Sequence, residues 1–190
     1  MTTAITIPKL STARLRLESL TAEHSTGMYA LWSHPDVCRY SGRVTDYDRN
    51  PIEMPARTVS DSDLIIEFWR RAAQDGWGFR WAVMRVGADS DAFIGTVGFN
   101  SIGQRSEIAY HLIPAYWGFG YMNEAAAAAI DWCMQTTRAQ APPHMREIEA
   151  FIEPANQPSI ALAERLGMVA TDYMNEGARR HLRRQDNAAG

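Results

Sequence analysis

The chain has little cysteine and no clustered metal ligands. Among its 190 residues are two cysteines, Cys38 and Cys133, which lie far apart, and no CxxC motif occurs. The five histidines show no spacing typical of metal ligands. Disulfide scaffolds and zinc sites both need Cys or His residues at short, regular spacings. We therefore expect reduced thiols, no disulfide framework and no metal site.

Long apolar segments are also missing. No apolar run is long enough to span a bilayer, and the opening residues 1–18 lack the apolar stretch of a secretory signal. The net charge of -3 provides no strong attraction for nucleic acid or acidic membranes. A basic cluster at 179–184 is interpreted as a solvated strand face or tail. These features predict a cytoplasmic protein with no nucleic-acid or membrane partner.

The length and composition fit one compact domain. A chain of 190 residues with 46% hydrophobic content can bury a core of its own. We expect a single domain over residues 1–190, with its core at about 10–184.

The hydrophobic pattern changes repeatedly between the helical and the strand period. It predicts, in order, strand 14–20, helices 24–33 and 60–75, strands 79–86, 93–100 and 105–112, helix 118–139, strand 145–152, helix 158–166 and a hairpin of 168–173 and 178–183. The fold class is therefore α/β (α+β), with a single mixed, mostly antiparallel twisted sheet and helices on both faces. The polar segment 41–59 is expected to be a functional or mobile loop.

Residues 108–125 place a strand, a Gly-x-Gly turn and a helix in succession. The first amides of a helix are unpaired and carry partial positive charge, so they bind phosphates. Gly118 and Gly120 let the backbone approach an anion closely. The turn lacks the lysine of a Walker P-loop, and Asn123 replaces the third glycine of a dinucleotide motif. For the bare motif, a plain glycine turn is the commoner interpretation.

Four motifs together change that interpretation. Residues 117–125 read W-G-x-G-Y-x-x-E-A, residues 156–168 read N-x-x-S followed by E-x-L-G-M, residues 12–17 read T-x-R-L-x-L, and residues 94–98 read I-G-x-x-G. In this order the chain resembles the GNAT superfamily of acyl-CoA-dependent N-acyltransferases, in particular its ribosomal-protein N-terminal acetyltransferase (Rim-type) branch. The resemblance covers roughly residues 10–175.

The resemblance implies a GNAT-like fold that uses acetyl-CoA as co-substrate. It implies that the pantetheine arm pairs with backbone at His111, Leu112 and Ile113. It implies that the diphosphate lies on the amides of the turn and first helical residues, which are Trp117, Gly118, Phe119, Gly120, Tyr121 and Met122. Asn156 corresponds to an asparagine that contacts the pantetheine or thioester, and Ser159 to a position near the sulfur.

The sequence departs from the family pattern in three places. Ala115 stands where a glutamine or arginine often precedes the glycines, so phosphate binding must depend more on backbone amides. Ala163 replaces the tyrosine that protonates the leaving thiolate in many members. Ser159, another tyrosine folded nearby or bulk water would then supply that proton. Ala109 stands where the branch usually has glycine.

The general base is left open between several residues. Glu107 is the first candidate and His111 the second, since both lie on the same face of strand 105–112. Glu149 and Glu153 come third; for each of the four, a packed or solvated side chain is the alternative. At pH 7 about a tenth of α-amines are neutral, against fewer than about one in a thousand lysines. An α-amine acceptor therefore loses its proton to the general base more easily than a lysine does.

The sequence thus predicts an N-acetyltransferase that transfers an acetyl group to a primary amine by direct attack in a ternary complex. The acceptor is a protein N-terminus, a free small amine or an aminoglycoside-like compound. The alternatives are a catalytically inactive CoA-binding sensor and a structural or interaction protein; no G-x-S-x-G motif supports a serine hydrolase. A homodimer is compatible with the resemblance.

Four aromatic residues lie on or next to the central strands: Trp77, Phe79, Trp81 and Phe99. We expect them to pack in the core, and the alternative is that they line the acceptor site.

Overall fold

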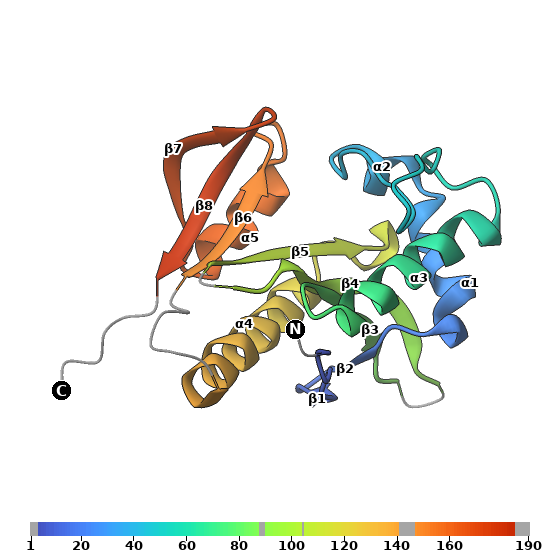
Figure 1. Ribbon diagram of the computed structural model, residues 1–190, viewed down its shortest axis with the longest axis horizontal. Coiled ribbons are helices and arrows are strands. Elements are labelled where there is room, and N and C mark those ends of the chain that lie inside the picture. Colours follow the sequence, from blue (N-terminus) through green and yellow to red (C-terminus); the bar gives the residue numbers. More distant parts are fainter. Residues whose placement is uncertain (1–3, 88–89, 104, 141–146, 185–190) are drawn as a thin grey trace.

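The computed structural model describes residues 4–87, 90–103, 105–140 and 147–184. They form one eight-stranded sheet in the order β1-β2-β3-β4-β5-β6-β8-β7 (Figure 1). The strands are β1 Leu10–Ser11, β2 Leu15–Ser19, β3 Phe79–Arg85, β4 Ala92–Ser101, β5 Arg105–Leu112, β6 Glu147–Ile152, β7 Val169–Asn175 and β8 Ala178–Arg184. All neighbouring pairs are antiparallel except β5 and β6, which are parallel. The predicted mixed, mostly antiparallel sheet is confirmed.

Five α-helices and two short 3₁₀ helices accompany the sheet. They are η1 Ala22–His24, α1 Ser25–Trp32, α2 Pro35–Cys38, α3 Val59–Gln74, η2 Pro114–Tyr116, α4 Tyr121–Gln140 and α5 Gln157–Arg165. None of the described helices combines the length and apolar character needed to cross a membrane. The start of the predicted strand 145–152, and residues 1–3 and 185–190 of the predicted domain, lie outside the described residues.

The helix ends follow local capping rules. Thr58 and Asp61 form a reciprocal capping box at the start of α3, which satisfies backbone amides that have no acceptor inside the helix. Gly76 follows this helix with a positive φ of 78°, a conformation that glycine adopts without steric cost. At α5, the Asn156 side chain accepts a hydrogen bond from the Ser159 amide. These caps fix where both helices begin, and α5 begins beside the cleft described below.

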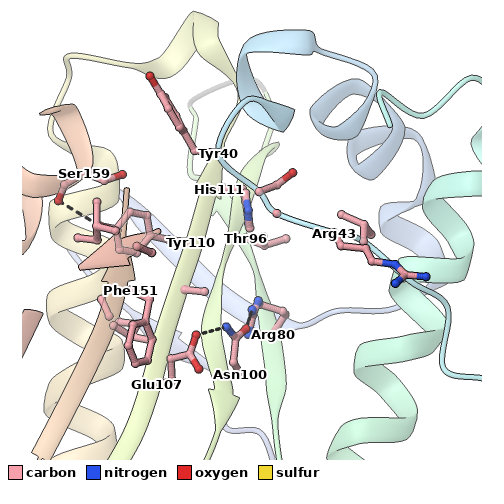
Figure 2. Close-up of a pocket in the computed structure, with 18 of the residues that line it drawn as sticks. Tyr40, Arg43, Arg80, Thr96, Asn100, Glu107, Tyr110, His111, Phe151 and Ser159 are labelled. Carbon is pink, nitrogen blue, oxygen red and sulfur yellow. Dashed lines mark hydrogen bonds between the residues drawn. The ribbon is translucent and has the colours of Figure 1, made fainter. Parts of the chain in front are cut away.

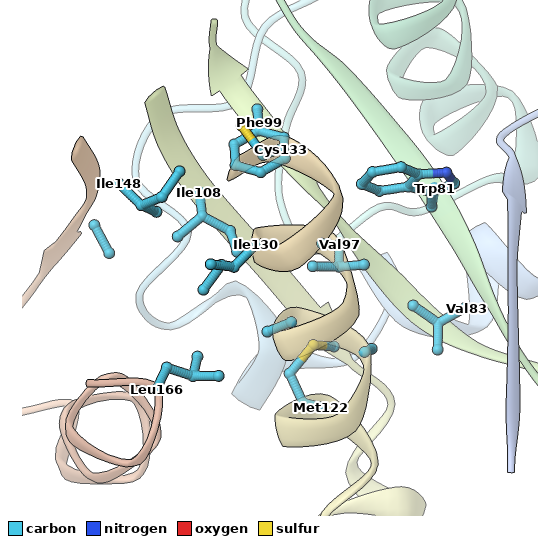
Figure 3. Close-up of a cluster of buried hydrophobic side chains, with 14 of the residues drawn as sticks. Trp81, Val83, Val97, Phe99, Ile108, Met122, Ile130, Cys133, Ile148 and Leu166 are labelled. Atoms are coloured by element: carbon cyan, nitrogen blue, oxygen red, sulfur yellow. The ribbon is translucent and has the colours of Figure 1, made fainter. Parts of the chain in front are cut away.

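Helix α4 covers one face of the sheet. Its alanines pack against large core side chains from the strands, because small residues let the helix approach closely (Figure 3). Phe79, Trp81 and Phe99 are fully buried there, so the core interpretation of these three aromatic residues is confirmed. Helices α1 and α3 cover the opposite face and pack around Ala82. Trp81 and Ala82 point to opposite faces, as the period of two along a strand requires.

Strands β5 and β6 separate soon after they begin. Their parallel pairing joins residues 105–107 to residues 147–149. Beyond this point β5 continues to Leu112 while β6 runs away from it, and the ribbon opens as a V (Figure 1). The split leaves backbone of β5 without a strand partner on that side. This opening is what positions the site.

Candidate active site

The turn after β5 is shaped by two glycines. Gly118 and Gly120 have φ values of 81° and 77°, the left-handed region that glycine favours. A Cβ added to Gly118 would meet nothing within 4 Å, so the turn is open to a ligand. The predicted helix start at 118 is wrong: η2 precedes the turn, and α4 begins at Tyr121. Left-handed glycines cannot continue a right-handed helix, which explains the later start.

The amides at this turn are free to meet an anion. Glu124 N donates to Gly120 O at 3.1 Å, which is the first bond of α4, so the amides of residues 121–123 have no acceptor inside the helix. Trp117 differs from the expectation because its amide donates to Pro114 O at 3.0 Å. The side-chain oxygen Oδ1 of Asn123 is buried without a partner. Of the residues predicted to hold the diphosphate, 118–122 lie at this open turn, whereas the Trp117 amide is already hydrogen-bonded.

A clamp from the turn between β1 and β2 holds the glycine turn. The Arg14 guanidinium donates to Glu124 at 2.7 Å and to the Phe119 carbonyl at 3.0 Å, and it lies over the Tyr121 ring at 4.5 Å. Thr12 Oγ1 donates to the same Glu124 carboxylate at 2.5 Å. The opening motif T-x-R and the E-A of the turn motif are therefore in direct contact. Hydrogen bonds to charged partners are the stronger kind, so the clamp restrains the turn.

A cavity of about 750 Å³, here called the turn cavity, lies at this turn. It is lined by the turn, the end of β5, the α2 segment and α5. Ile113 N donates to Ile94 O of β4 at 2.8 Å, and alternation along a strand then directs the backbone groups of Leu112 toward the split. The Leu112 carbonyl accepts from the Trp117 indole at 2.7 Å. The Trp117 indole is therefore hydrogen-bonded to the Leu112 carbonyl, one of the backbone groups expected to meet a pantetheine arm.

A second cavity of about 540 Å³, here called the inner cavity, lies between α1, α3 and the separating strands (Figure 2). Five residues line both cavities, and they come from three distant segments: Tyr40, Tyr110, His111, Asn156 and Ser159. Among the described residues, these five mark the place where a ligand bound in one cavity can meet a ligand bound in the other. They are called the junction below. Of the predicted catalytic residues, His111 and Ser159 lie at this junction, whereas Glu107 lies in the inner cavity alone.

Glu107 is held in a hydrogen-bonded chain with a buried arginine. Asn100 Nδ2 donates to Glu107 at 2.5 Å, and Asn100 Oδ1 accepts from Arg80 (Figure 2). Arg80 is 3% exposed, and its guanidinium lies over the Trp69 ring at 3.7 Å. Burial lowers the Arg80 pKa to about 9, against the opposing charge of Glu107. These hydrogen bonds position the Glu107 carboxylate in the inner cavity, where it can accept a proton directly or through water.

His111 is held in its neutral form. Burial, and secondarily the positive charge of Arg80, lowers its pKa to about 3. The imidazole lies 4.6 Å from the Trp32 ring, and its buried Nδ1 has no hydrogen-bond partner. An imidazole with so low a pKa is a weaker base than an ordinary histidine. His111 is therefore a neutral polar group that faces the junction.

The third-choice carboxylates lie in different surroundings. Glu149 pairs with Arg105 at 3.7 Å. Its pKa is raised, chiefly by burial. It faces Glu107 across the strand pair but does not line the inner cavity. Glu153 is exposed and does line the inner cavity. Neither reaches the junction.

Two tyrosines at the junction were not identified from the sequence. The Tyr110 hydroxyl donates to the Ser159 carbonyl at 3.4 Å, and burial raises its pKa to about 12. The Tyr40 hydroxyl donates to Ala155 O across the cleft at 3.4 Å. The strand pattern identifies Tyr110 as an inward residue, but nothing local relates Tyr40 to residue 155. Asn156 uses its side-chain oxygen to cap α5, which leaves its amide N–H groups for a ligand.

A split mixed sheet with a glycine turn at the mouth of its long helix defines an acyl-CoA-dependent transferase. A family model described as the acetyltransferase (GNAT) domain matches residues 14–169, and the chain belongs to this family. Its activity is accordingly acetyl-CoA-dependent N-acetyl transfer. Among the described residues, no group of three or more His, Cys, Asp or Glu side chains is arranged to hold a metal ion.

Named relatives agree with this assignment. The chain is 31% identical to the N-acetyltransferase p20 of Bacillus licheniformis over 160 residues, 83% of this chain and 80% of p20. It resembles RimL, a ribosomal L7/L12 α-N-protein acetyltransferase solved with coenzyme A, with a TM-score of 0.72 at 15% identity, covering 94% of this chain and 99% of RimL. An acetyltransferase from Salmonella typhimurium that modifies the N-terminal serine of L7/L12 gives 0.69 at 15% identity, covering 92% and 97%. The last two likenesses concern the fold.

Proposed function

We propose that the enzyme acetylates the primary amine of a protein N-terminus or a small molecule, by direct attack on the thioester while both substrates are bound. The observation that carries this proposal is the meeting of two cavities at five residues. Holding two reactants together converts a bimolecular step into an effectively unimolecular one. The RimL likeness supports a protein N-terminus as one acceptor class.

Acetyl-CoA is assigned to the turn cavity. The amides of residues 118–122 would hold the diphosphate. The buried Asn123 oxygen is an acceptor, so its partner would be a hydrogen-bond donor and not the diphosphate. Leu112 and Asn156 would line the pantetheine arm, with Ser159 near the sulfur. Ile113 does not line the turn cavity, and its amide is bonded to Ile94. Trp117 would support the arm through its indole bond to Leu112. The thioester would supply an activated acetyl group at the junction.

The amine is assigned to the inner cavity. Glu107 would take a proton from the ammonium, directly or through water, so that the neutral nitrogen attacks the thioester carbon. The nitrogen–carbon bond forms and the carbon–sulfur bond breaks. The acylated nitrogen then loses its second proton, and the departing thiolate gains one, so the products are an amide and a thiol. We propose Ser159 or Tyr40 as the proton donor to the thiolate, because both lie at the junction. Burial raises the Tyr110 pKa to about 12, so this hydroxyl is a weaker acid than an ordinary tyrosine.

Two broader properties belong to the same proposal: a single domain over residues 1–190 and a location in the cytoplasm. The proposal is compatible with a homodimer and leaves the oligomeric state open. The test of the function is thiol release from acetyl-CoA with a panel of primary amines, including a peptide with a free α-amine. Amine-dependent release supports the proposal. Binding of CoA without release for any amine would favour the inactive CoA-binding module instead.

A further inference from the structure

The inner cavity adjoins a third space of about 560 Å³, here called the outer cavity. Six residues line it: Arg43, Thr45, Tyr47, Arg49, Phe68 and Trp77. Four of them, Arg43, Thr45, Phe68 and Trp77, also line the inner cavity, so the two spaces share a wall. A molecule that presents its amine near Glu107 can therefore extend into the outer cavity. Trp77 lines both spaces, as the alternative interpretation of this aromatic residue predicted.

The walls of the outer cavity are flat and aromatic. The Tyr47 ring lies 5.7 Å from that of Phe68 and 6.4 Å from that of Trp77, and Phe68 lies 5.6 Å from Trp77. All three side chains are half-buried and not part of the sealed core. Aromatic faces at a partly open site favour a planar, unsaturated group in contact with them.

The charged groups of the outer cavity are all positive. Arg43 and Arg49 are exposed (Arg43 is drawn in Figure 2), and within the described residues neither guanidinium has an ion pair or hydrogen bond. In the same segment, Arg57 pairs with Glu53. A planar guanidinium without a partner, next to aromatic rings, is suited to a carboxylate or phosphate.

Within the described residues, the neighbouring acids form no ion pair with these two arginines. Asp46 accepts hydrogen bonds from the backbone and side chain of Asn50. Asp48 pairs with Arg71 at 3.6 Å, and Asp75 accepts the Tyr47 hydroxyl. Asp46 and Asp75 keep their charge, but none of the three carboxylates forms an ion pair or hydrogen bond with the Arg43 or Arg49 guanidinium. The donors of both guanidinium groups therefore remain available to a ligand.

The opposite wall of the inner cavity carries negative charge. Glu107, Glu153 and Glu176 line it, from β5, the end of β6 and the β7–β8 turn. The buried Arg80 also lines the inner cavity, linked through Asn100 to Glu107. Apart from this arginine, carboxylates lie near the β5–β6 split, and the exposed arginines Arg43 and Arg49 lie toward the outer end. An ammonium is attracted to the first end and an oxyanion to the second. A polycation such as a polyamine or an aminoglycoside would meet unfavourable charge at the arginine end.

We propose that the acceptor is a primary amine with a flat, unsaturated body and a carboxylate or phosphate group remote from the amine. This inference rests on the proposed function and narrows its acceptor class. Arg43 and Arg49 determine the specificity for the oxyanion, and Tyr47, Phe68 and Trp77 hold the flat part. The amine then points toward Glu107 and the junction.

Matched amines test the proposal. We would measure thiol release with para-(aminomethyl)benzoate, para-(aminomethyl)benzylphosphonate, para-methylbenzylamine and spermidine. The first three share one ring and one amine and differ in the group at the far end. We expect at least one anionic amine to exceed the neutral amine about tenfold in kcat/KM, the size of one hydrogen bond to a charged group. Comparing kcat/KM for the carboxylate amine and the phosphonate amine shows which of the two oxyanions is preferred. Equal values for the anionic and neutral amines would overturn the proposal.

Substitutions test whether Arg43 and Arg49 cause the preference for anionic amines. In the double variant Arg43→Gln and Arg49→Gln, the ratio of kcat/KM for the anionic over the neutral amine should fall toward one. Arg57→Gln is the matched control, since it removes a charge from the same segment outside the cavities. It should keep the wild-type ratio. A double variant that also keeps that ratio contradicts the proposal.

A binding measurement separates this inference from the proposed function. If no amine causes thiol release, the proposed function fails, and calorimetry with the same amines in the presence of CoA still tests the acceptor class. Tighter binding of an anionic amine than of para-methylbenzylamine, lost in the double variant, supports the inference. Binding without such a preference overturns it. Acetyl-CoA binding by each variant controls for folding.

Discussion

Glu107 and His111 lie on one strand face but in different electrostatic surroundings. Glu107 is hydrogen-bonded to Asn100 and lines the inner cavity. His111 has lost water around Nδ1 and faces the charge of Arg80, which lowers its pKa to about 3. Strand alternation predicted the shared face. It could not predict the neutral imidazole, because Arg80 and Trp32 come from other elements.

The Glu107 assignment predicts a loss in the chemical step. Glu107→Gln keeps the shape of the side chain and removes the base, so kcat should fall about 100-fold, the usual contribution of a general base. The KM for acetyl-CoA should change little, because Glu107 does not line the turn cavity. Glu149→Gln is the control on the neighbouring strand. A Glu107→Gln enzyme with the wild-type rate from pH 6 to pH 9 would remove this residue from the mechanism.

The neutral state of His111 predicts a dependence of stability on pH. Its folded pKa of about 3 lies below the ordinary value of 6.5, so between these values the unfolded chain binds the extra proton. The free energy of unfolding therefore falls as pH falls through this window, by at most about 1.4 kcal/mol per pH unit from this one group. Urea unfolding at pH 6.5 and 4.5 should show a smaller loss in His111→Gln than in the wild type.

Exposed His34 provides the control for that comparison. His34→Gln should lose as much stability between the two pH values as the wild type does. An equal loss in His111→Gln and in the wild type would show that the imidazole is protonated in the folded protein. His111 would then return as a candidate base.

Among the elements, the glycine turn determines whether a diphosphate can be held. Gly118→Ala introduces no clash but disfavours the φ of 81°, at a cost of about 1–2 kcal/mol. If the turn changes shape to avoid that cost, the Kd for acetyl-CoA should rise about tenfold. Calorimetry measures it.

Gly177 offers a matched control for this change. It has a φ of 85° with nothing within 4 Å of an added Cβ, and it lies in the β7–β8 turn away from the turn cavity. Gly177→Ala carries a similar backbone cost and should leave acetyl-CoA binding as in the wild type. If both variants weaken binding equally, the effect belongs to general stability and not to the diphosphate turn.

The sequence predicted the longer elements closely and the short ones poorly. The periodic pattern for helix 60–75 and strand 105–112 matches α3 and β5 within a residue or so. Helix α2 was missed because four residues provide too little periodicity, although Pro35 marks its start. The start of α4 was misplaced because a glycine turn and a first helical turn differ in the sign of φ, which composition does not report.

At the scale of the molecule, the junction depends on segments that the sequence keeps far apart. Tyr40 follows α2, Tyr110 and His111 belong to β5, and Ser159 belongs to α5. The motifs identified His111 and Ser159, because each lies in a local pattern, but they did not identify Tyr110. Tyr40 lies in no such pattern, and only the folded chain brings it across the cleft to residue 155. The arginines of the outer cavity were likewise invisible, because their lack of partners is a tertiary property.

The central claim is that acetyl-CoA lies in the turn cavity with its sulfur at the junction. A crystal structure of the enzyme with coenzyme A tests it most directly. We expect the diphosphate on the amides of residues 118–122, the pantetheine arm in the β5–β6 split, and the sulfur beside His111 and Ser159. A coenzyme A molecule bound elsewhere, or a split filled by the protein's own side chains, would contradict the account.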